Sequence, residues 1–193
     1  MRVNYSVKLG TTPATRCAMA QRSEGFTLID LIFTIGLLSI LMLIAMGPLL
    51  KARQQAGSAS AIGSLRALNS AELSFALTCG GGFYAPDLTT LGTAPVGSRD
   101  AFVGADLGAS DPVIKAGYVI QLDAAPYPGA PTSCNGLGIG AAGQSYRAAA
   151  DPTEPGNPRF FATNADGLIW EDNATLFAVM PETGEPAAGH TLR

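Results

Sequence analysis

The sequence has few of the residues on which catalysis and metal binding most often depend. His190 is its only histidine, so a Ser-His-Asp or Cys-His arrangement would have to use a residue in a tail rich in Pro, Gly and Glu. A structural zinc site takes four ligands, and Cys79 and Cys134 with one remote histidine do not supply them. We therefore expect no catalytic residues, no metal site and no cofactor, and a protein that is not an enzyme.

Basic and aromatic residues are also scarce. Of the 12 Lys and Arg residues, four lie in residues 1–24, and of the 15 Asp and Glu residues, one does, so residues 26–193 carry a net charge of about −6. Surfaces that bind nucleic acid need clustered Lys and Arg over the phosphates, so a nucleic-acid partner is not favoured. Aromatic residues make up 7% of the chain, too few to indicate a stacked path for electrons.

Two motifs suggest ligands but lack the surroundings that those ligands need. Gly138–Gly143 fits the GxGxxG pattern of dinucleotide-binding folds, which needs a strand before it and an amphipathic helix after it. Here a loop containing Pro and Cys precedes the motif, and strand-like residues follow it. Asp172 and Asn173 could contribute to a calcium site, but a hard cation takes six or more oxygen ligands. We expect an exposed acidic turn there instead.

What the chain does have is a long apolar run. The segment from Leu31 to Leu50 carries no formal charge, and about 20 residues at 1.5 Å each cover the roughly 30 Å hydrocarbon core of a bilayer. Asp30 stands at the start of this run. A carboxylate costs about 2.5–3.5 kcal/mol at the middle of a bilayer and less toward the interface, so we expect Asp30 to have a partner for its charge.

Residues 1–24 are basic and contain no apolar run. They carry Arg2, Lys8, Arg16 and Arg22 against Glu24, and the positive-inside rule places such a segment in the cytoplasm. A secretory signal peptide has its cleavage site after the hydrophobic region, whereas here the plausible processing point precedes it. The alternative is an ordinary single-pass anchor that keeps its basic cytoplasmic tail.

At the junction of these two segments, the chain resembles the type IV pilin-like family, which includes pilins and the pseudopilins of type II secretion. Gly25-Phe26-Thr27-Leu28-Ile29 is similar to the family's prepilin-peptidase motif, and Asp30 stands where the family nearly always has Glu. The resemblance implies cleavage between Gly25 and Phe26, methylation of the new Phe26 amine, and a role for Asp30 in assembly with a neighbouring subunit. It also implies prepilin peptidase, an inner-membrane assembly platform, membrane lipid and copies of the same chain as partners.

The cysteines indicate an oxidising compartment. Cys17 would leave with the cleaved leader, residues 1–25, so that Cys79 and Cys134 remain as one pair. A disulfide between them is permitted outside the cytosol. We expect this bridge, and two buried thiols are the alternative.

A single long helix is expected from Thr27 to about Leu77, with a membrane-spanning half over 26–50 and an amphipathic half over 51–79. Pro48 predicts a kink or a local opening near Gly47. Beyond Pro48, four apolar residues at helical spacing predict packing on the chain's own sheet: Ile62, Leu65, Leu68 and Phe75. Asn69 and Glu72 interrupt this apolar stripe. Gly80-Gly81-Gly82 should end the helix.

The rest of the chain predicts a small antiparallel sheet. Residues 80–117 are expected to be a variable connection with one helical turn at Pro86–Leu91, and 181–193 a loose tail. The region 118–180 holds four strand candidates, Tyr118–Leu122, Ser145–Ala149, Arg159–Thr163 and Leu168–Glu171, the last two joined by a hairpin turn at Asn164–Gly167. This is an α+β layout, which also resembles the pilin fold.

Together with the resemblance, these features imply a structural subunit that is held in the inner membrane, with its C-terminal domain in the periplasm, and that then polymerises into a type IV pilus-like filament outside the cell. The alternative within the same family is the major pseudopilin of a type II secretion system, in a periplasmic pseudopilus. Two alternatives of other classes are a single-pass membrane-anchored periplasmic binding domain and a membrane-tethered hydrolase. The hydrolase is the weaker of the two, because the sequence does not offer a set of catalytic residues.

Overall fold

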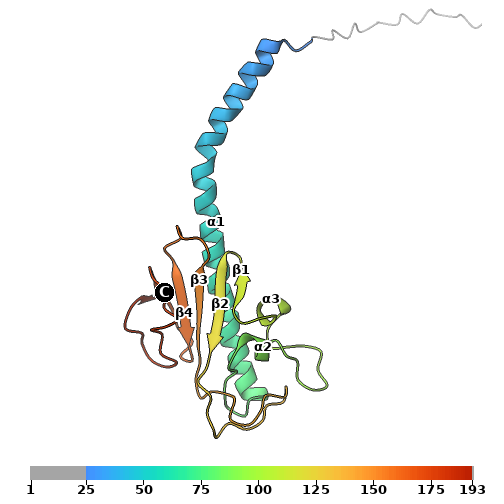
Figure 1. The fold of residues 1–193 in the computed structure, drawn as a ribbon, viewed down its shortest axis with the longest axis vertical. Coiled ribbons are helices and arrows are strands. Elements are labelled where there is room, and N and C mark those ends of the chain that lie inside the picture. Colours follow the sequence, from blue (N-terminus) through green and yellow to red (C-terminus); the bar gives the residue numbers. More distant parts are fainter. Residues whose placement is uncertain (1–24, 193) are drawn as a thin grey trace, which may run out of the picture. The chain divides into compact units, whose positions relative to one another are not determined.

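The computed structural model describes residues 25–192; the expected leader, apart from Gly25, lies outside the described residues, as does Arg193. The chain divides into two compact units, Met1–Ala45 and Met46–Arg193. Helix α1 (Leu28–Thr78) begins in the first unit and ends in the second (Figure 1). The first unit is described only by its part of α1, whereas the second contains the sheet and both hydrophobic clusters.

The bounds of α1 agree with the expected helix from Thr27 to about Leu77. Of the kink or local opening expected near Gly47, the opening is absent, because the backbone stays helical through Gly47 and Pro48. Proline removes one N–H donor and crowds the carbonyl four residues before it, yet α1 continues through Pro48.

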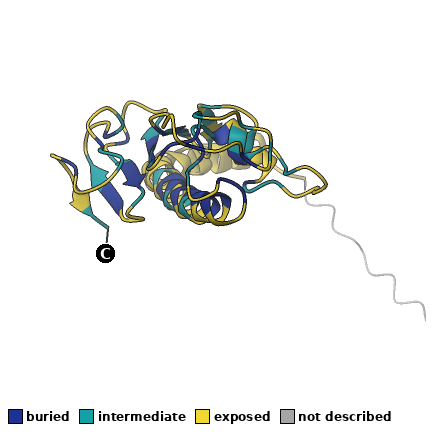
Figure 2. Ribbon diagram, turned by 90° about the horizontal axis from the view of Figure 1, so that it is seen from below, coloured by how far each residue is buried: buried dark blue, intermediate teal, exposed yellow. Residues whose placement is uncertain are grey.

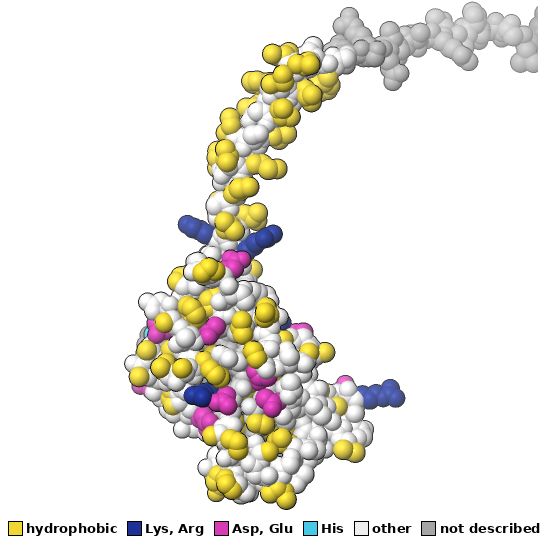
Figure 3. All heavy atoms as spheres, in the orientation of Figure 1, with side chains coloured by type: hydrophobic (Ala, Val, Ile, Leu, Met, Phe, Trp, Pro, Cys, Tyr) yellow, Lys and Arg dark blue, Asp and Glu magenta, His cyan; other side chains and the backbone are white. Residues whose placement is uncertain are grey.

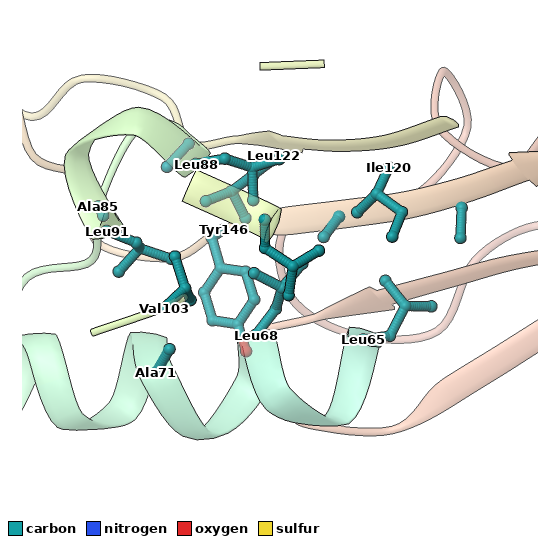
Figure 4. Packing of buried hydrophobic residues seen from close by; sticks show 14 of the residues in the cluster. Leu65, Leu68, Ala71, Ala85, Leu88, Leu91, Val103, Ile120, Leu122 and Tyr146 are labelled. Carbon is teal, nitrogen blue, oxygen red and sulfur yellow. The ribbon is translucent and has the colours of Figure 1, made fainter. Parts of the chain in front are cut away.

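The C-terminal part of α1 packs on the sheet through the expected apolar stripe. Leu65, Leu68 and Phe75 are fully buried, and Ile62 is partly buried against the same cluster. Figure 4 shows Leu65 and Leu68 on the helix pointing toward Ile120 and Leu122 of the sheet. Seen from below, this part of α1 is buried on one side and exposed on the other (Figure 2). The stripe is therefore core, as expected.

Glycines end α1 where the sequence predicted. A Cβ at Gly80 would lie 2.2 Å from the carbonyl oxygen of Phe83, and Gly81 has a φ of 62°. Only a residue without a side chain fits the first position, and the left-handed conformation at the second favours glycine. The chain then turns back to run beside the helix.

Six antiparallel strands form one sheet in the order β1-β2-β3-β4-β5-β6. Their bounds are β1 Val113–Lys115, β2 Tyr118–Asp123, β3 Arg147–Pro152, β4 Phe160–Asn164, β5 Ile169–Asp172 and β6 His190–Thr191. Each strand thus pairs with the strand next to it in the sequence. A long helix packed on a small antiparallel sheet is the α+β fold that was expected.

Both faces of the sheet are covered in its middle. The larger cluster lies between α1 and one face, and a smaller one on the other face contains Trp170, Leu176 and Met180. Between them, Ala148, Ala149 and Ala150 of β3 are all fully buried. Small side chains at these positions let covering segments approach the strand from both sides.

Some elements differ from the expectation. The connection 80–117 contains strand β1 and two short helices, α2 (Leu88–Leu91) at the expected helical turn and α3 (Ala105–Gly108). Strand β3 extends to Pro152, beyond the expected end at Ala149. Its Asp151 and Pro152 pair with β2 but not with β4, so the proline lies where one side of the strand has no partner, a position that it tolerates.

The tail is not loose over its described part. Strand β6 pairs with β5, and the Glu182 carboxylate accepts hydrogen bonds from the backbone N of Ala125 (2.7 Å) and the hydroxyl of Ser145 (2.7 Å). The fully buried Asn164 donates to the Gly184 carbonyl at 2.7 Å. The composition of 181–193 concealed these bonds, because they join the tail to residues distant in the sequence.

Candidate functional site

The apolar segment 26–50 exposes its side chains. Every large apolar residue between Phe26 and Leu50 is exposed, from 48% at Leu37 to 86% at Phe26. The helix that contains them is long and apolar enough to cross a membrane, which is compatible with a single-pass membrane anchor. A surface of this kind needs an apolar environment outside the monomer.

Asp30 closes the first turn of this helix through reciprocal hydrogen bonds with Thr27. Its Oδ2 accepts from the Thr27 hydroxyl at 2.6 Å and from the Thr27 backbone N at 3.2 Å. The Asp30 backbone N in turn donates to the Thr27 hydroxyl at 3.3 Å. This is a capping box with Asp in place of Glu. The Thr-x-x-Asp spacing could have predicted it from the sequence.

The expected processing junction, Gly25-Phe26, is exposed to solvent in the monomer. Gly25 and Phe26 precede the first helical residue, and both are exposed. A Cβ at Gly25 would meet nothing within 4 Å, so packing in the described part of the chain does not require glycine there. Gly25, Phe26 and Asp30 lie within one short stretch at the start of α1.

The cysteine pair forms the expected disulfide, Cys79–Cys134. Cys79 follows the last residue of α1, and the Cys134 backbone N also donates to the Cys79 carbonyl at 3.2 Å. The bond therefore ties the loop between β2 and β3 to the end of the helix.

Breaking this disulfide should destabilise the second unit. The bridged residues are 55 apart in the sequence, and the chain-entropy model gives about 4 kcal/mol for a loop of that length. We expect the double variant Cys79→Ser/Cys134→Ser to lose about this much free energy of unfolding in urea, measured by the fluorescence of the single, buried Trp170. Two freely alkylated thiols in the exported, unreduced protein would contradict the bridge.

The other candidate residues lie apart from one another. His190 is exposed on β6 and pairs with Glu171 of β5. Gly138–Gly143 is loop, and strand β3 rather than a helix follows it. At the expected acidic turn, the Asn173 backbone N donates to the Asp172 carboxylate at 2.7 Å. Within residues 25–192, no three or more His, Cys, Asp or Glu side chains gather as a metal site would need.

One acidic residue, Glu72, is buried, which was not predicted from the sequence. Glu72 of α1 is fully buried; its Oε2 accepts a hydrogen bond from the Ala85 backbone N at 2.9 Å, and its Oε1 has no partner. Burial raises the pKa of Glu72 to about 8, with a smaller contribution from the nearby Asp87 carboxylate, while the bond from Ala85 opposes the shift. The helical position of Glu72, within the apolar stripe, could have signalled this burial.

Searches of protein-family models, curated proteins and solved structures find no match to this chain.

Proposed function

We propose that this chain is a pilin-like structural subunit that prepilin peptidase processes at Gly25-Phe26 and that polymerises through the helix segment 26–50. The observation that carries the proposal is an exposed apolar helix segment whose one charged side chain, Asp30, lies next to an open Gly-Phe junction. A membrane anchor alone explains the apolar surface. It does not require a charge at position 30, since a neutral Gln can also complete a capping box, and packing does not require glycine at position 25.

In this proposal the apolar segment has two successive environments. It is first dissolved in the inner membrane, and it is then buried against the same segment of neighbouring subunits. Transfer between two apolar environments gains little hydrophobic free energy, so close packing and charge pairing must favour assembly. Asp30 is the group that supplies the pairing, with the Phe26 amine of a neighbouring subunit as its partner.

The proposed location follows from the same features. The basic residues 1–24 remain in the cytoplasm until cleavage, and the unit that carries the disulfide lies in the periplasm. The disulfide supports an oxidising compartment for this unit. The finished filament is then a surface pilus or, if the subunit belongs to a type II secretion system, a periplasmic pseudopilus. A membrane-anchored binding domain that is never cleaved is the contrasting class.

Processing is the sharpest test of the proposal. Mass spectrometry of the native protein should find a chain that begins at Phe26 with a methylated amine. Gly25→Val should retain residues 1–25, because a bulky side chain next to the peptide bond to be cut would obstruct the peptidase. Gly63→Ala is the matched control, since Gly63 is likewise exposed and a Cβ there would meet nothing within 4 Å, and it should be processed normally. A native wild-type protein that keeps Met1–Gly25 would favour the uncleaved anchor instead.

A further inference from the structure

A groove of the second unit lies beside the part of α1 that directly follows the apolar segment. It has a volume of about 440 Å³. One wall is α1 from Leu50 to Gly57, and the others are the β1–β2 turn and the β3–β4 loop with Glu154 and Asn157. A second, smaller hollow of about 210 Å³ adjoins it and is lined by Lys51 and Gln54 among others.

Close contacts between α1 and the β1–β2 turn hold the groove in shape. A Cβ at Gly57 would lie 2.8 Å from the carbonyl oxygen of Ala116, so glycine is what lets the turn approach the helix. Ala116 has a φ of 50° and Gly117 a φ of 80°, as the two central residues of the tight turn between β1 and β2.

Buried hydrogen bonds support the same wall. The Tyr118 hydroxyl lies 2.9 Å from the Ser58 hydroxyl on α1, accepts from the Asn157 side-chain amide at 2.9 Å, and donates to the Arg159 carbonyl at 3.2 Å. Helix, strand and loop are thus joined at one point. A groove built in this way is preformed rather than an opening between loosely packed segments.

The groove offers one side chain of each charge. Arg53 and Glu154 both line it, and neither takes part in an ion pair within residues 25–192. Lys51 adds a second cation in the adjoining hollow. Figure 3 shows basic side chains on α1 next to the folded domain, with an acidic side chain close by. A ligand complementary to this groove carries an anionic and a cationic group a short distance apart.

The position along the helix indicates where such a ligand is found. Leu50 is the last residue of the apolar segment and also lines the groove, and Arg53 follows three residues later. At 1.5 Å per residue, Arg53 lies about 4.5 Å beyond the end of the apolar segment. The headgroup layer on each side of the hydrocarbon core is about 5–8 Å thick, so Arg53 would lie at headgroup depth when the segment 26–50 spans the bilayer.

We propose that this groove binds the zwitterionic headgroup of a phosphatidylethanolamine molecule while the subunit is in the membrane. Arg53 binds the phosphate, with Lys51 beside it, and Glu154 accepts hydrogen bonds from the primary ammonium group. Arginine matches phosphate through several parallel N–H donors. The inference rests on the membrane anchoring proposed above, and it adds a lipid-binding site that holds the folded unit against the bilayer surface until assembly.

The test uses the full chain in lipid nanodiscs, followed by native mass spectrometry after release into mild detergent. With equal amounts of phosphatidylethanolamine, phosphatidylglycerol and phosphatidylcholine, the wild-type chain should retain phosphatidylethanolamine at least threefold more often than either of the others. Arg53→Gln should reduce retention of all three lipids. Glu154→Gln should abolish the preference over phosphatidylglycerol, because the carboxylate no longer repels an anionic lipid or binds the ammonium.

Arg66→Gln and Glu185→Gln are the matched controls, because both residues are exposed and neither lines the groove. Both variants should behave as the wild type does. Equal retention of the three lipids by the wild-type chain would overturn the inference, and so would a preference that survives both groove substitutions. A dimer without lipid that Arg53→Gln dissociates would assign the groove to a second copy of the chain instead. Failure of the chain to insert into nanodiscs would contradict the anchoring itself, which separates the two proposals.

Discussion

Asp30→Ala is expected to leave membrane insertion, processing and the folded second unit intact while removing nearly all filaments. In the proposed assembly, the variant leaves the Phe26 amine of a neighbouring subunit as an unpaired charge in an apolar interface. Removing one partner of a buried ion pair costs about 3–5 kcal/mol, which is more than about a hundredfold in an association constant. Electron microscopy of sheared filaments, with immunoblots of sheared and membrane fractions, measures the loss.

The capping box makes controls necessary, because Asp30 also holds the first turn of α1 through Thr27. Asp30→Asn keeps an oxygen that can accept from Thr27 but removes the charge, and it should fail to assemble as Asp30→Ala does. Thr27→Ala removes the hydroxyl and keeps the charge, and a lost cap costs only about 0.5–2 kcal/mol, so it should still form filaments. Asp30→Glu should assemble at least as well as the wild type. A normal filament yield from Asp30→Asn would show that capping, not charge pairing, explains the acid.

The long helix could be predicted from the sequence because its signals are local. An uncharged run, a stripe at helical spacing and three successive glycines define the start, the buried face and the end of α1, and the structure agrees to within one residue. The hairpin at Asn164–Gly167 was predicted for the same reason: its turn residues are adjacent, and the Gly167 backbone N donates to the Asn164 carbonyl at 2.9 Å.

What the sequence did not show depends on partners far away along the chain. Strand β1 is only Val113–Lys115, and its signal is too short to recognise until β2 pairs with it. Strand β6 lies in a stretch whose composition is typical of a loose tail, but its place is fixed by β5 and by Glu182 and Asn164. For the candidate site, the sequence placed Gly25, Phe26 and Asp30 correctly at the start of the helix, but the bonds between Thr27 and Asp30 were not foreseen.

The sequence also did not show whether the polar residues within the apolar stripe of α1 are buried and hydrogen-bonded. Asn69 and Glu72 were expected to interrupt the apolar face, yet Asn69 bonds to the sheet and Glu72 is fully buried. The Asn69 side chain donates to the Thr163 hydroxyl at 2.9 Å and accepts from the Tyr146 hydroxyl at 2.9 Å. Helical spacing predicts which way a residue points, but only the folded chain shows whether a buried polar group has a partner. Asn69 has its partners, whereas one oxygen of Glu72 has none.

That difference predicts an unusual pH dependence for Glu72. Its pKa is about 8 in the folded chain against an ordinary value of 4.5. Between these values the folded chain keeps a proton on Glu72 that the unfolded chain has released, so the free energy of unfolding falls as the pH rises from 4.5 to about 8. Below pH 4.5 both states hold the proton and no loss occurs. At pH 8 the loss is on the order of 4–5 kcal/mol, since each unit of pKa shift corresponds to 1.36 kcal/mol.

Glu72→Gln should remove this loss, because the neutral amide has the same shape, can accept from the Ala85 backbone N, and does not ionise. At pH 8 the variant should exceed the wild type in free energy of unfolding by several kcal/mol, and at pH 4 the two should agree within about 1 kcal/mol. Urea unfolding of the full chain in detergent, followed by Trp170 fluorescence from pH 4 to pH 9, measures both. Glu185→Gln, at an exposed acid, should keep the wild-type pH dependence. Parallel pH profiles for Glu72→Gln and the wild type would mean that Glu72 ionises in the folded chain at its ordinary pKa, and that water or a shifted backbone reaches its unpaired oxygen.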